Sequence, residues 1–212
     1  NAFWHGVTAS SALIGCVIGG AISGVCASRM GRRNSLRLSA VLLFLSALGS
    51  YYPEFIFFEK GDTSFSLILA FNFYRILGGV GVGLASAISP MYIAEVAPTS
   101  IRGKLVSLNQ LTIVLGILGA QIANWLIAEP IPADFTPADI CASWNGQMGW
   151  RWMFWGAAFP AAVFLLLACF IPESPRWLAM KNREKKAFVT LNKIGGNSYA
   201  QAELLAVKVL GV

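Results

Sequence analysis

The sequence RILGGVGVGLASAISPMYIAEVAPTSIRG occupies residues 75–103 and closes a long apolar segment of the chain. That segment runs from residue 63 to residue 94, and Arg75 is the only charged residue in it. A helix of about 20 apolar residues crosses a hydrocarbon core that is about 30 Å thick. We therefore predict a membrane-spanning helix at about residues 66–94 that carries one cation.

The composition of the whole chain favours a membrane setting. The chain has 212 residues, of which 56% are hydrophobic and 12% are charged, and its mean hydropathy is +0.63. A soluble domain carries about a quarter charged residues and fewer apolar ones. The composition therefore excludes an ordinary soluble domain and an intrinsically disordered chain.

Four other segments are long and apolar enough to be spans, at about residues 6–28, 36–58, 104–128 and 150–172. None alternates between apolar and polar residues as a membrane β-strand does, so helices are expected to satisfy the backbone. We predict an all-α membrane protein in which residues 1–172 form a bundle of five transmembrane helices.

Basic residues are distributed unevenly between the predicted loops. The segments after the first, third and fifth spans have net charges of +4, +1 and +4, and the two segments between them have net charges of −2 and −3. Short cytoplasmic loops concentrate Lys and Arg. We therefore place residues 173–212 in the cytoplasm and the start of the chain outside it. The net charge of +6 then reflects topology, and no nucleic-acid partner is expected.

The start of the chain carries a further expectation. Asn1 lies on the outer side in this orientation, and five spans are an odd number. No basic segment with a cleavage site precedes the first span, so a signal peptide is not indicated. We expect that at least one helix precedes these five and that the chain is a fragment of a longer protein.

Residues suited to enzymatic chemistry are sparse. His5 is the only histidine, and the cysteines Cys16, Cys26, Cys141 and Cys169 lack metal-ligand spacing. No nucleophile–base pair, phosphate-binding loop or acidic cluster can be assembled from the sequence. We therefore expect no metal, no cofactor and no enzymatic activity, and we interpret the cysteines as apolar packing residues.

Glycines recur at helical spacing within the predicted spans. Gly15 and Gly19 are four residues apart in the first span, and Gly79 and Gly83 are four apart in the third. Small residues at this spacing let two helix backbones approach closely. The glycines predict tight helix packing, and contact surfaces that slide against each other are the functional alternative.

Two polar side chains inside the predicted spans are candidates for a functional site. Arg75 is costly in a hydrocarbon core unless it is paired or hydrated, although it could also cap a neighbouring helix or reach the interface. Gln110, in the fourth span, has two donors and two acceptor lone pairs, which suits a sugar hydroxyl better than an ion. An amide in a span needs a partner, so a hydrogen bond to another helix is the alternative for Gln110.

Charged residues gather at the predicted cytoplasmic ends of the spans. Arg29, Arg32 and Arg33 follow the first span, and Glu95 and Arg102 lie between the third and fourth spans. Guanidinium groups and carboxylates form bidentate pairs, which can hold two parts of a transporter together and break when its inner face opens. Simple anchoring at the interface is the alternative.

The segment after the fifth span reads PESPRWL at residues 172–178. Ser174 is a suitable N-cap and the proline after it a suitable first helical residue, so a helix is expected to start there. Apolar residues then recur at helical spacing up to Gly195 and Gly196, where the helix should end. We predict that residues 173–212 form an intracellular linker of amphipathic helices, with a helix lying on the membrane as the alternative.

Three motifs in the chain belong together. The first inner loop, GVCASRMGRR, fits the pattern G-x-x-x-D-R-x-G-R-R except that Ser28 stands at the usual Asp. Residues 75–103 fill every fixed position of R-x-x-x-G-x-G-x-G followed by P-x-Y-x-x-E-x-x-P-x-x-x-R-G. With PESPRWL, these motifs resemble the sugar porter family of the major facilitator superfamily. The resemblance implies the N-terminal half of such a protein, from its second to its sixth transmembrane helix, followed by intracellular helices.

The resemblance also implies roles for individual residues. In the family, the glutamine that corresponds to Gln110 contacts the bound sugar, and Ile113 and Ile117 line the site; we assign Gln121, on the same helix, to it as well. Arg75 is implied in proton coupling, with an acidic residue of the absent first helix as its partner. The implied cytoplasmic gate consists of Arg29, Arg32, Arg33, Glu95, Arg102, Glu173 and Arg176.

The function implied by the resemblance is transport of a monosaccharide across the cell membrane by alternating access. Proton symport is expected, and a facilitative uniporter or a membrane sugar sensor are the alternatives. Isoleucine at position 117 is typical of facilitative glucose transporters and favours a hexose. The implied partners are the sugar, protons, the lipid bilayer, and the first helix and C-terminal half of the same protein.

Overall fold

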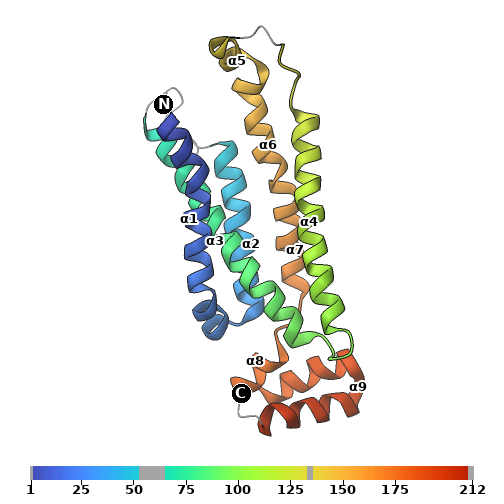
Figure 1. Cartoon of the computed structure of the whole chain (residues 1–212). Coiled ribbons are helices and arrows are strands. Elements are labelled where there is room, and N and C mark those ends of the chain that lie inside the picture. The colour runs from blue at the N-terminus through green and yellow to red at the C-terminus, as the bar shows by residue number, and fades with distance from the viewer. Residues whose placement is uncertain (1, 53–64, 133–135, 210–212) are drawn as a thin grey trace.

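The computed structural model of the chain describes residues 2–52, 65–132 and 136–209 (Figure 1). All regular structure in these ranges is helical, which confirms the predicted all-α class for this part of the chain. In chain order, the helices are α1 (Ala2–Met30), α2 (Arg32–Tyr51), α3 (Phe65–Val96), α4 (Arg102–Ile127), α5 (Pro137–Ala142), the π-helix η1 (Asn145–Gly149), α6 (Trp150–Gly156), α7 (Ala158–Phe170), α8 (Pro175–Met180) and α9 (Glu184–Val209).

Among the described residues, four helical stretches are long and apolar enough to cross a membrane: Gly6–Met30, Ile68–Val96, Arg102–Ile127 and Asn145–Phe170. They correspond to the first, third, fourth and fifth spans that the sequence predicts. The predicted span at 36–58 corresponds to α2, which is helical but not one of these four. Arginines in its first two turns lower its hydropathy, and residues 53–58 lie outside the described part of the chain.

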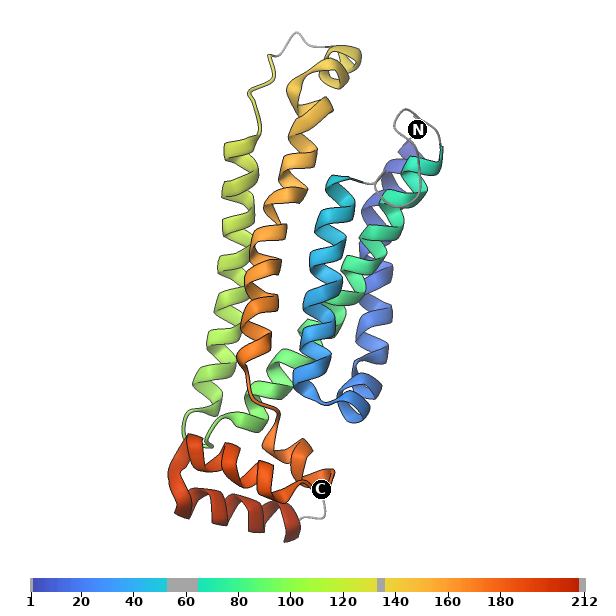
Figure 2. The ribbon, with the colours of Figure 1, turned by 180° about the vertical axis from the view of Figure 1, so that it is seen from behind.

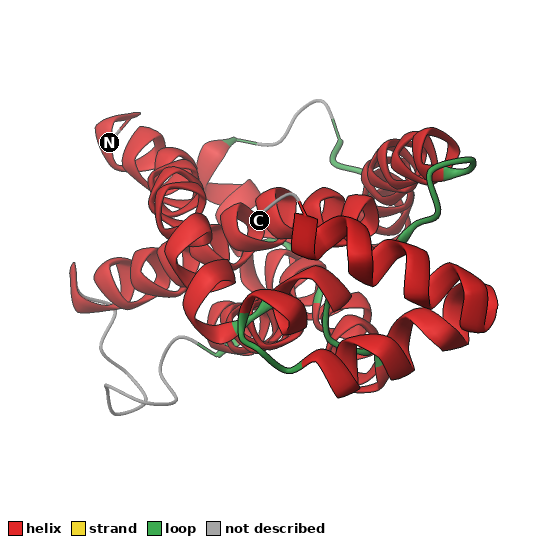
Figure 3. Cartoon of the chain, turned by 90° about the horizontal axis from the view of Figure 1, so that it is seen from below, coloured by secondary structure: helices red, strands yellow, loops and turns green. Residues whose placement is uncertain are grey.

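The helices form two groups that run side by side (Figures 1 and 2). In one group, α3 contacts both α1 and α2. In the other, α4 lies beside α6 and α7, and α2 joins the two groups through its contacts with α6 and α7. α8 and α9 lie across one end of the bundle, as the view from below shows (Figure 3). We call this end the α8–α9 end and the opposite one the α5 end.

The predicted close packing of glycines occurs between α1 and α3. A Cβ atom on Gly79 of α3 would overlap the carbonyl oxygen of Ala12 in α1, and one on Gly15 of α1 would overlap the carbonyl oxygen of Ile76 in α3. Only a hydrogen at these positions lets the two backbones touch. The tight packing is confirmed, and sliding along this contact stays a prediction.

A buried apolar cluster lies toward the α8–α9 end of α1, α2 and α3. Ala27, Leu36, Leu84 and Ile88 form its centre and are at most 4% exposed. Phe164 of α7 packs against them. Dispersion contacts in such a close-packed cluster hold membrane helices together where no water drives their association. The cluster therefore fixes the helix ends that carry the charged residues described below.

The helical backbone is interrupted at two points whose residues explain the interruption. α6 ends at Gly156 and α7 begins at Ala158, because Pro160 has no N–H to donate and its ring clashes with the carbonyl four residues earlier. Within α9, Gly196 has a φ of 82°, which interrupts the helical backbone. The break at Gly196 confirms the helix end that the sequence predicts there. The single helix predicted from Ser174 to that point is wrong, because the stretch is divided between Met180 and Glu184, where Asn182 has a φ of 57°.

Candidate functional site

α8 begins with a buried serine that joins it to α3. Ser174 is 0% exposed, and its Oγ accepts a hydrogen bond from the backbone N–H of Trp177 at 3.3 Å. The same hydroxyl donates to Oε2 of Glu95 at 2.5 Å. The predicted N-cap is therefore confirmed, and it also holds the carboxylate near the end of α3.

The Glu95 carboxylate is paired with Arg32 at the start of α2. Nε and Nη2 of Arg32 lie 3.1 and 2.7 Å from Oε1 of Glu95, and the two side chains are only 11% and 12% exposed. Nη1 of Arg32 also donates to the carbonyl oxygen of Ala27 in α1. Charge-assisted hydrogen bonds with little access to water are stronger than exposed ion pairs. The bonds of Arg32 therefore hold α1, α2 and α3 together.

The Glu173 carboxylate holds the turn between α1 and α2. Its Oε1 accepts hydrogen bonds from the backbone N–H groups of Arg33 and Ser174, each at 3.0 Å. Gly31, in the turn, has a φ of 89°, and a Cβ atom there would overlap the carboxylate of Glu173. Glycine at position 31 is therefore required both by its backbone conformation and by the carboxylate beside it. We call Arg32, Arg33, Glu95, Glu173 and Ser174 the inner cluster.

Two arginines of α2 bind the end of α7. Nη2 of Arg33 donates to the carbonyl oxygen of Cys169 at 2.9 Å. Arg37 donates to the carbonyl oxygens of Ala168 and Cys169, at 3.1 and 2.8 Å. Cations at a helix C-terminus satisfy its free carbonyls and complement its dipole. The sequence reasoning missed Arg37, although its position one helical turn after Arg33 was an available signal.

Two aromatic side chains, which the sequence reasoning also missed, complete these connections. The Tyr92 hydroxyl of α3 donates to the carbonyl oxygen of Pro172, just before α8, at 3.0 Å. The Trp177 indole of α8 donates to the carbonyl oxygen of Ser28 in α1 at 3.0 Å. Position 28 is the one that departs from the family pattern, and it contacts α8 through its backbone. α8 is thus bonded to α1 and α3, and the residue before its N-cap is bonded to α2.

Three of the seven predicted gate residues lie outside the inner cluster. Arg29 is exposed, and the structure gives it no ion pair within the described residues. Arg102 reaches only the carbonyl oxygen of Ala97, at 3.5 Å, and its Nε is buried without a hydrogen-bond partner. Arg176 lies 3.8 Å from Glu203 in a solvent-exposed pair. The structure therefore brings Arg32, Arg33, Glu95 and Glu173 together and separates the other three, whose role in a gate stays a prediction.

A tyrosine of α9 lies among those separate charges. Burial raises the pKa of Tyr199, the Glu203 carboxylate raises it further, and the Arg102 and Arg176 guanidinium groups oppose the shift. The charges that act on Tyr199 come from the start of α4, from α8 and from α9 itself. α9 thus contributes to a second polar group at the α8–α9 end, next to the inner cluster.

Arg75 lines a cavity of about 460 Å³ between α1, α2, α3 and the α6–α7 pair. Its guanidinium carbon lies 5.4 Å from the centre of the Phe154 ring, within cation–π range. Its Nε is buried and has no hydrogen-bond partner. Arg75 therefore faces the cavity. Its unpaired Nε is costly there, because a polar group without a partner is least favourable where the dielectric is low.

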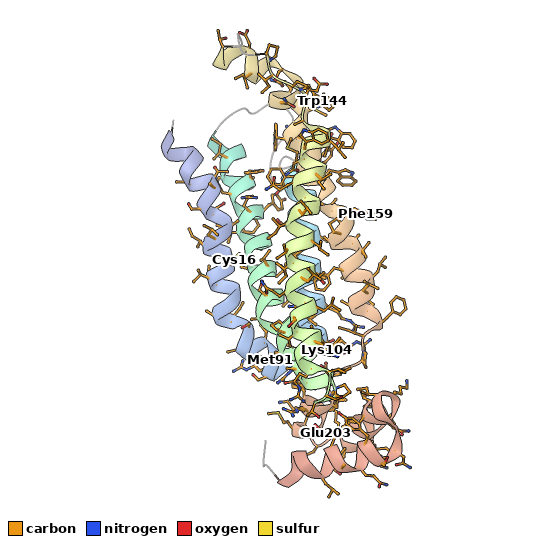
Figure 4. All side chains as sticks on the ribbon, turned by 45° about the vertical axis from the view of Figure 1, so that its right-hand side comes forward. Cys16, Met91, Lys104, Trp144, Phe159 and Glu203 are labelled. Atoms are coloured by element: carbon orange, nitrogen blue, oxygen red, sulfur yellow. The ribbon has the colours of Figure 1, made fainter. Side chains whose placement is uncertain are left out.

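The four predicted sugar-site residues lie on α4, away from that cavity. Gln110, Ile113, Ile117 and Gln121 follow at intervals of three and four residues, which places them along one face of the helix. All four are exposed, and no residue of α4 is buried. Figure 4 shows the side chains that project from α4 along its length. The structure thus leaves this helix face open and does not join it to Arg75 through a common cavity.

Metal ligands do not gather in the described part of the chain. No group of three or more His, Cys, Asp or Glu residues there is placed to hold a metal ion. Cys16, Cys26 and Cys169 are free thiols. The side chains of His5 and Cys141 lie outside the described residues.

Membrane-length helices, a buried polar cluster at one end and an open helix face with two amides define part of a membrane carrier. The family described as "Sugar (and other) transporter" matches residues 1–209. The chain belongs to this family, which comprises transporters rather than enzymes.

Individual relatives agree with this assignment. The chain is 46% identical to the D-xylose-proton symporter of Escherichia coli strain K12 over 209 residues, which are 96% of this chain and 41% of the relative. It is 42% identical to the glucose transport protein of Synechocystis sp. over 191 residues, which are 90% of this chain and 37% of the relative. The chain therefore spans about two fifths of the length of these relatives.

A solved structure confirms the fold. The partially occluded inward open conformation of the xylose transporter XylE from E. coli matches with a TM-score of 0.85 and 44% identity. The match covers 97% of this chain and 47% of that one. The predicted major facilitator fold is therefore correct for the part of the protein present here.

Proposed function

We propose that the protein containing this chain carries a monosaccharide across the cell membrane by alternating access, in symport with protons. The names of the relatives support both the sugar and the proton. The observation that carries the proposal is the open face of α4, where Gln110, Ile113, Ile117 and Gln121 are all exposed on a helix with no buried residue. A helix of this kind is available to a ligand and to the remaining helices of a carrier.

The chemistry of that face suits an uncharged sugar. Gln110 and Gln121 each supply two donors and an acceptor oxygen, which match hydroxyl groups that both donate and accept. Ile113 and Ile117 between them offer apolar contact to the C–H bonds of the ring. Ile117 matches the isoleucine that is typical of facilitative glucose transporters, and on that resemblance we propose a hexose as the substrate.

Arg75 is our candidate for proton coupling. It is a cation in a cavity, with a buried Nε that lacks a partner. A carboxyl group from another segment of the protein would pair with it when ionised and release it when protonated, because an adjacent cation favours the charged form of a carboxyl. Protonation at that group would then change the packing around α3, which also carries Glu95.

We propose that the inner cluster is this half's share of the cytoplasmic gate, together with the exposed Arg29 and Arg176 and the half-buried Arg102. We also propose the orientation that the loop charges favour, in which the chain starts outside the cell and residues 173–212 lie in the cytoplasm. The gate would be completed by the C-terminal half of the same protein. The Arg32–Glu95 pair lies within this half, so it would set the shape of the gate surface that the other half meets.

Uptake into proteoliposomes tests the proposed function. The full-length protein should take up labelled hexose, and Gln110→Ala should lower uptake at least about tenfold, since losing a hydrogen bond to a substrate hydroxyl leaves a polar group unpaired. Gln201→Ala, which removes an exposed amide from α9, is the matched control and should transport normally. Normal uptake by folded Gln110→Ala protein would remove Gln110 from the site.

A pH electrode outside the vesicles tests the coupling. Sugar-dependent alkalinisation of the outer medium is expected for symport, and Arg75→Met should abolish it while sugar equilibrates. Transport that is indifferent to an imposed pH gradient would reject symport and leave facilitated uniport as the mechanism.

A further inference from the structure

At the α5 end of α4, the side chain of Asn145 bonds to the segment that follows the helix. Asn145 begins η1, which leads directly into α6. Its Oδ1 accepts a hydrogen bond from the backbone N–H of Glu129 at 2.9 Å, and its Nδ2 donates to the backbone carbonyl of Glu129 at 2.7 Å. Glu129 lies just after the end of α4. One amide therefore closes two hydrogen bonds with a single backbone residue, as residues in paired strands do.

This arrangement requires a particular side chain at position 145. A carboxamide presents one acceptor and one donor side by side, whereas a carboxylate only accepts. The surroundings also make room for it, because a Cβ atom on the buried Gly149 would lie 3.2 Å from Oδ1 of Asn145. η1 is a π-helix, a wider turn that is uncommon and recurs at functional positions in proteins. The local structure is thus built around the amide.

The other end of α4 has its own polar contact. The Ser89 hydroxyl of α3 donates to Oδ1 of Asn109 at 3.2 Å. Between this contact and Glu129, no residue of α4 is buried, so side-chain packing within the chain does little to fix the helix. Within the described residues, the direction of α4 relative to α3 and α6 therefore rests largely on polar contacts near its two ends.

The distance of each sugar-site residue from Asn109 and from Glu129 decides which of the two polar contacts fixes its position. With a rise of about 1.5 Å per residue, Ile117, Gln121 and Glu129 lie about 12, 18 and 30 Å beyond Asn109. If α4 pivots at Asn109, a shift at Glu129 moves Ile117 by about two fifths as much and Gln121 by about three fifths. Gln110 is next to the pivot and hardly moves.

We propose that Asn145 is a positioning residue for the sugar site, because it holds the α5 end of α4 against η1 and thereby places Ile117 and Gln121. The proposal rests on the proposed function, since it assumes that this face of α4 binds the sugar. Asn145 itself does not touch the substrate. Its loss lets α4 swing, so the half of the site farther from Asn109 loses its fixed geometry.

Kinetics of the full-length protein in proteoliposomes are the first test. Asn145→Ala should raise the KM for sugar about fivefold while Vmax stays within about twofold, because the loss is in binding rather than in the transport cycle. Asn145→Asp keeps the acceptor and loses the donor, so its KM should fall between those of the parent and of Asn145→Ala. Glu129→Ala is the matched control, because only the backbone of Glu129 takes part, and it should leave KM unchanged.

Spin-label distances are the second test and do not depend on transport. Labels at Leu126 of α4 and Leu69 of α3, both exposed in this chain, should give a broader distance distribution in Asn145→Ala than in Glu129→Ala. An unchanged distribution in folded Asn145→Ala protein, or a broader one with an unchanged KM, would overturn the positioning role. If the parent protein transports no sugar, the proposed function fails by itself, and the distances still decide whether Asn145 holds α4.

Discussion

The two ends of the bundle are held by different kinds of contact. At the α8–α9 end, Ser174, Glu95 and Arg32 form a continuous chain of hydrogen bonds with little access to solvent. At the α5 end, the amide of Asn145 is only partly buried and holds the backbone of an exposed residue. A buried network enforces one geometry because each lost partner leaves a polar group unsatisfied. A partly exposed amide holds a helix in place and still leaves its face open to a ligand.

Glu95→Gln should produce the largest loss of stability. It leaves the Arg32 guanidinium in a nearly buried site without a counter-charge, and breaking a buried pair from one side costs about 3 kcal/mol. Unfolding of the full-length protein in detergent, followed by fluorescence against temperature, measures the change. The control is Glu203→Gln, which removes an exposed pair separated by 3.8 Å and should cost at most about 0.5 kcal/mol. Equal shifts for both variants would contradict the contrast between the two kinds of contact.

Gly31→Ala should rank second. An alanine at position 31 would have to adopt a φ of 89°, and its Cβ atom would overlap the Glu173 carboxylate. The substitution therefore combines backbone strain with displacement of a hydrogen-bonded side chain. We expect a loss of about 2 kcal/mol in the same unfolding assay. Gly103→Ala is the control, because no atom lies near its added Cβ and the helix there gains from alanine. A Gly31→Ala protein as stable as Gly103→Ala would show that the carboxylate can move without cost.

Ser174→Ala should cost less than either, about 1.5 kcal/mol, because it removes the N-cap of α8 and one hydrogen bond to Glu95 but no charge. Ser28→Ala is the matched control, since its exposed hydroxyl bonds only to a carbonyl within its own helix. The assay is again thermal unfolding in detergent. Stability equal to that of Ser28→Ala would mean that α8 docks without its cap.

Local sequence patterns predicted the helices and several contacts well. The spacing of Gly15 from Gly19 and of Gly79 from Gly83 indicates close packing, Ser174 indicates the start of α8, and Gly196 indicates a break in α9. Each of these features depends on residues within one or two helical turns. Arg75 in an apolar segment indicates a cation that needs a partner or water unless it caps a helix or reaches the interface, and in the structure it lines a cavity.

The partners of the charged residues could not be predicted in the same way. The sequence groups Glu95 with several cations, but its partner Arg32 lies 63 residues earlier, because helix packing decides which cation reaches it. Tyr92 binds a backbone carbonyl, which leaves no charge pattern in the sequence. Asn145 gives no signal for the same reason, since both of its bonds go to the backbone.

Titration of Asp139 should have the smallest effect on stability. It tests the contrast between the two ends of the bundle at the α5 end. Hydrogen bonds from the side chain and backbone of Thr136 lower the pKa of Asp139, which is fully exposed. A folded-state pKa below the ordinary value gives stability that is present above that ordinary value, near pH 4, and that is lost as pH falls through the lower folded value. We expect the protection factors of the α5 amides, which are exchange rates corrected for the intrinsic rate at each pH, to fall below about pH 4. The melting temperature should change no more than in Thr136→Val, which removes the capping hydroxyl. If Thr136→Val shows the same acid-dependent loosening of α5 as the parent, the capping bonds are not its cause, and the α5 end would owe its local order to packing instead.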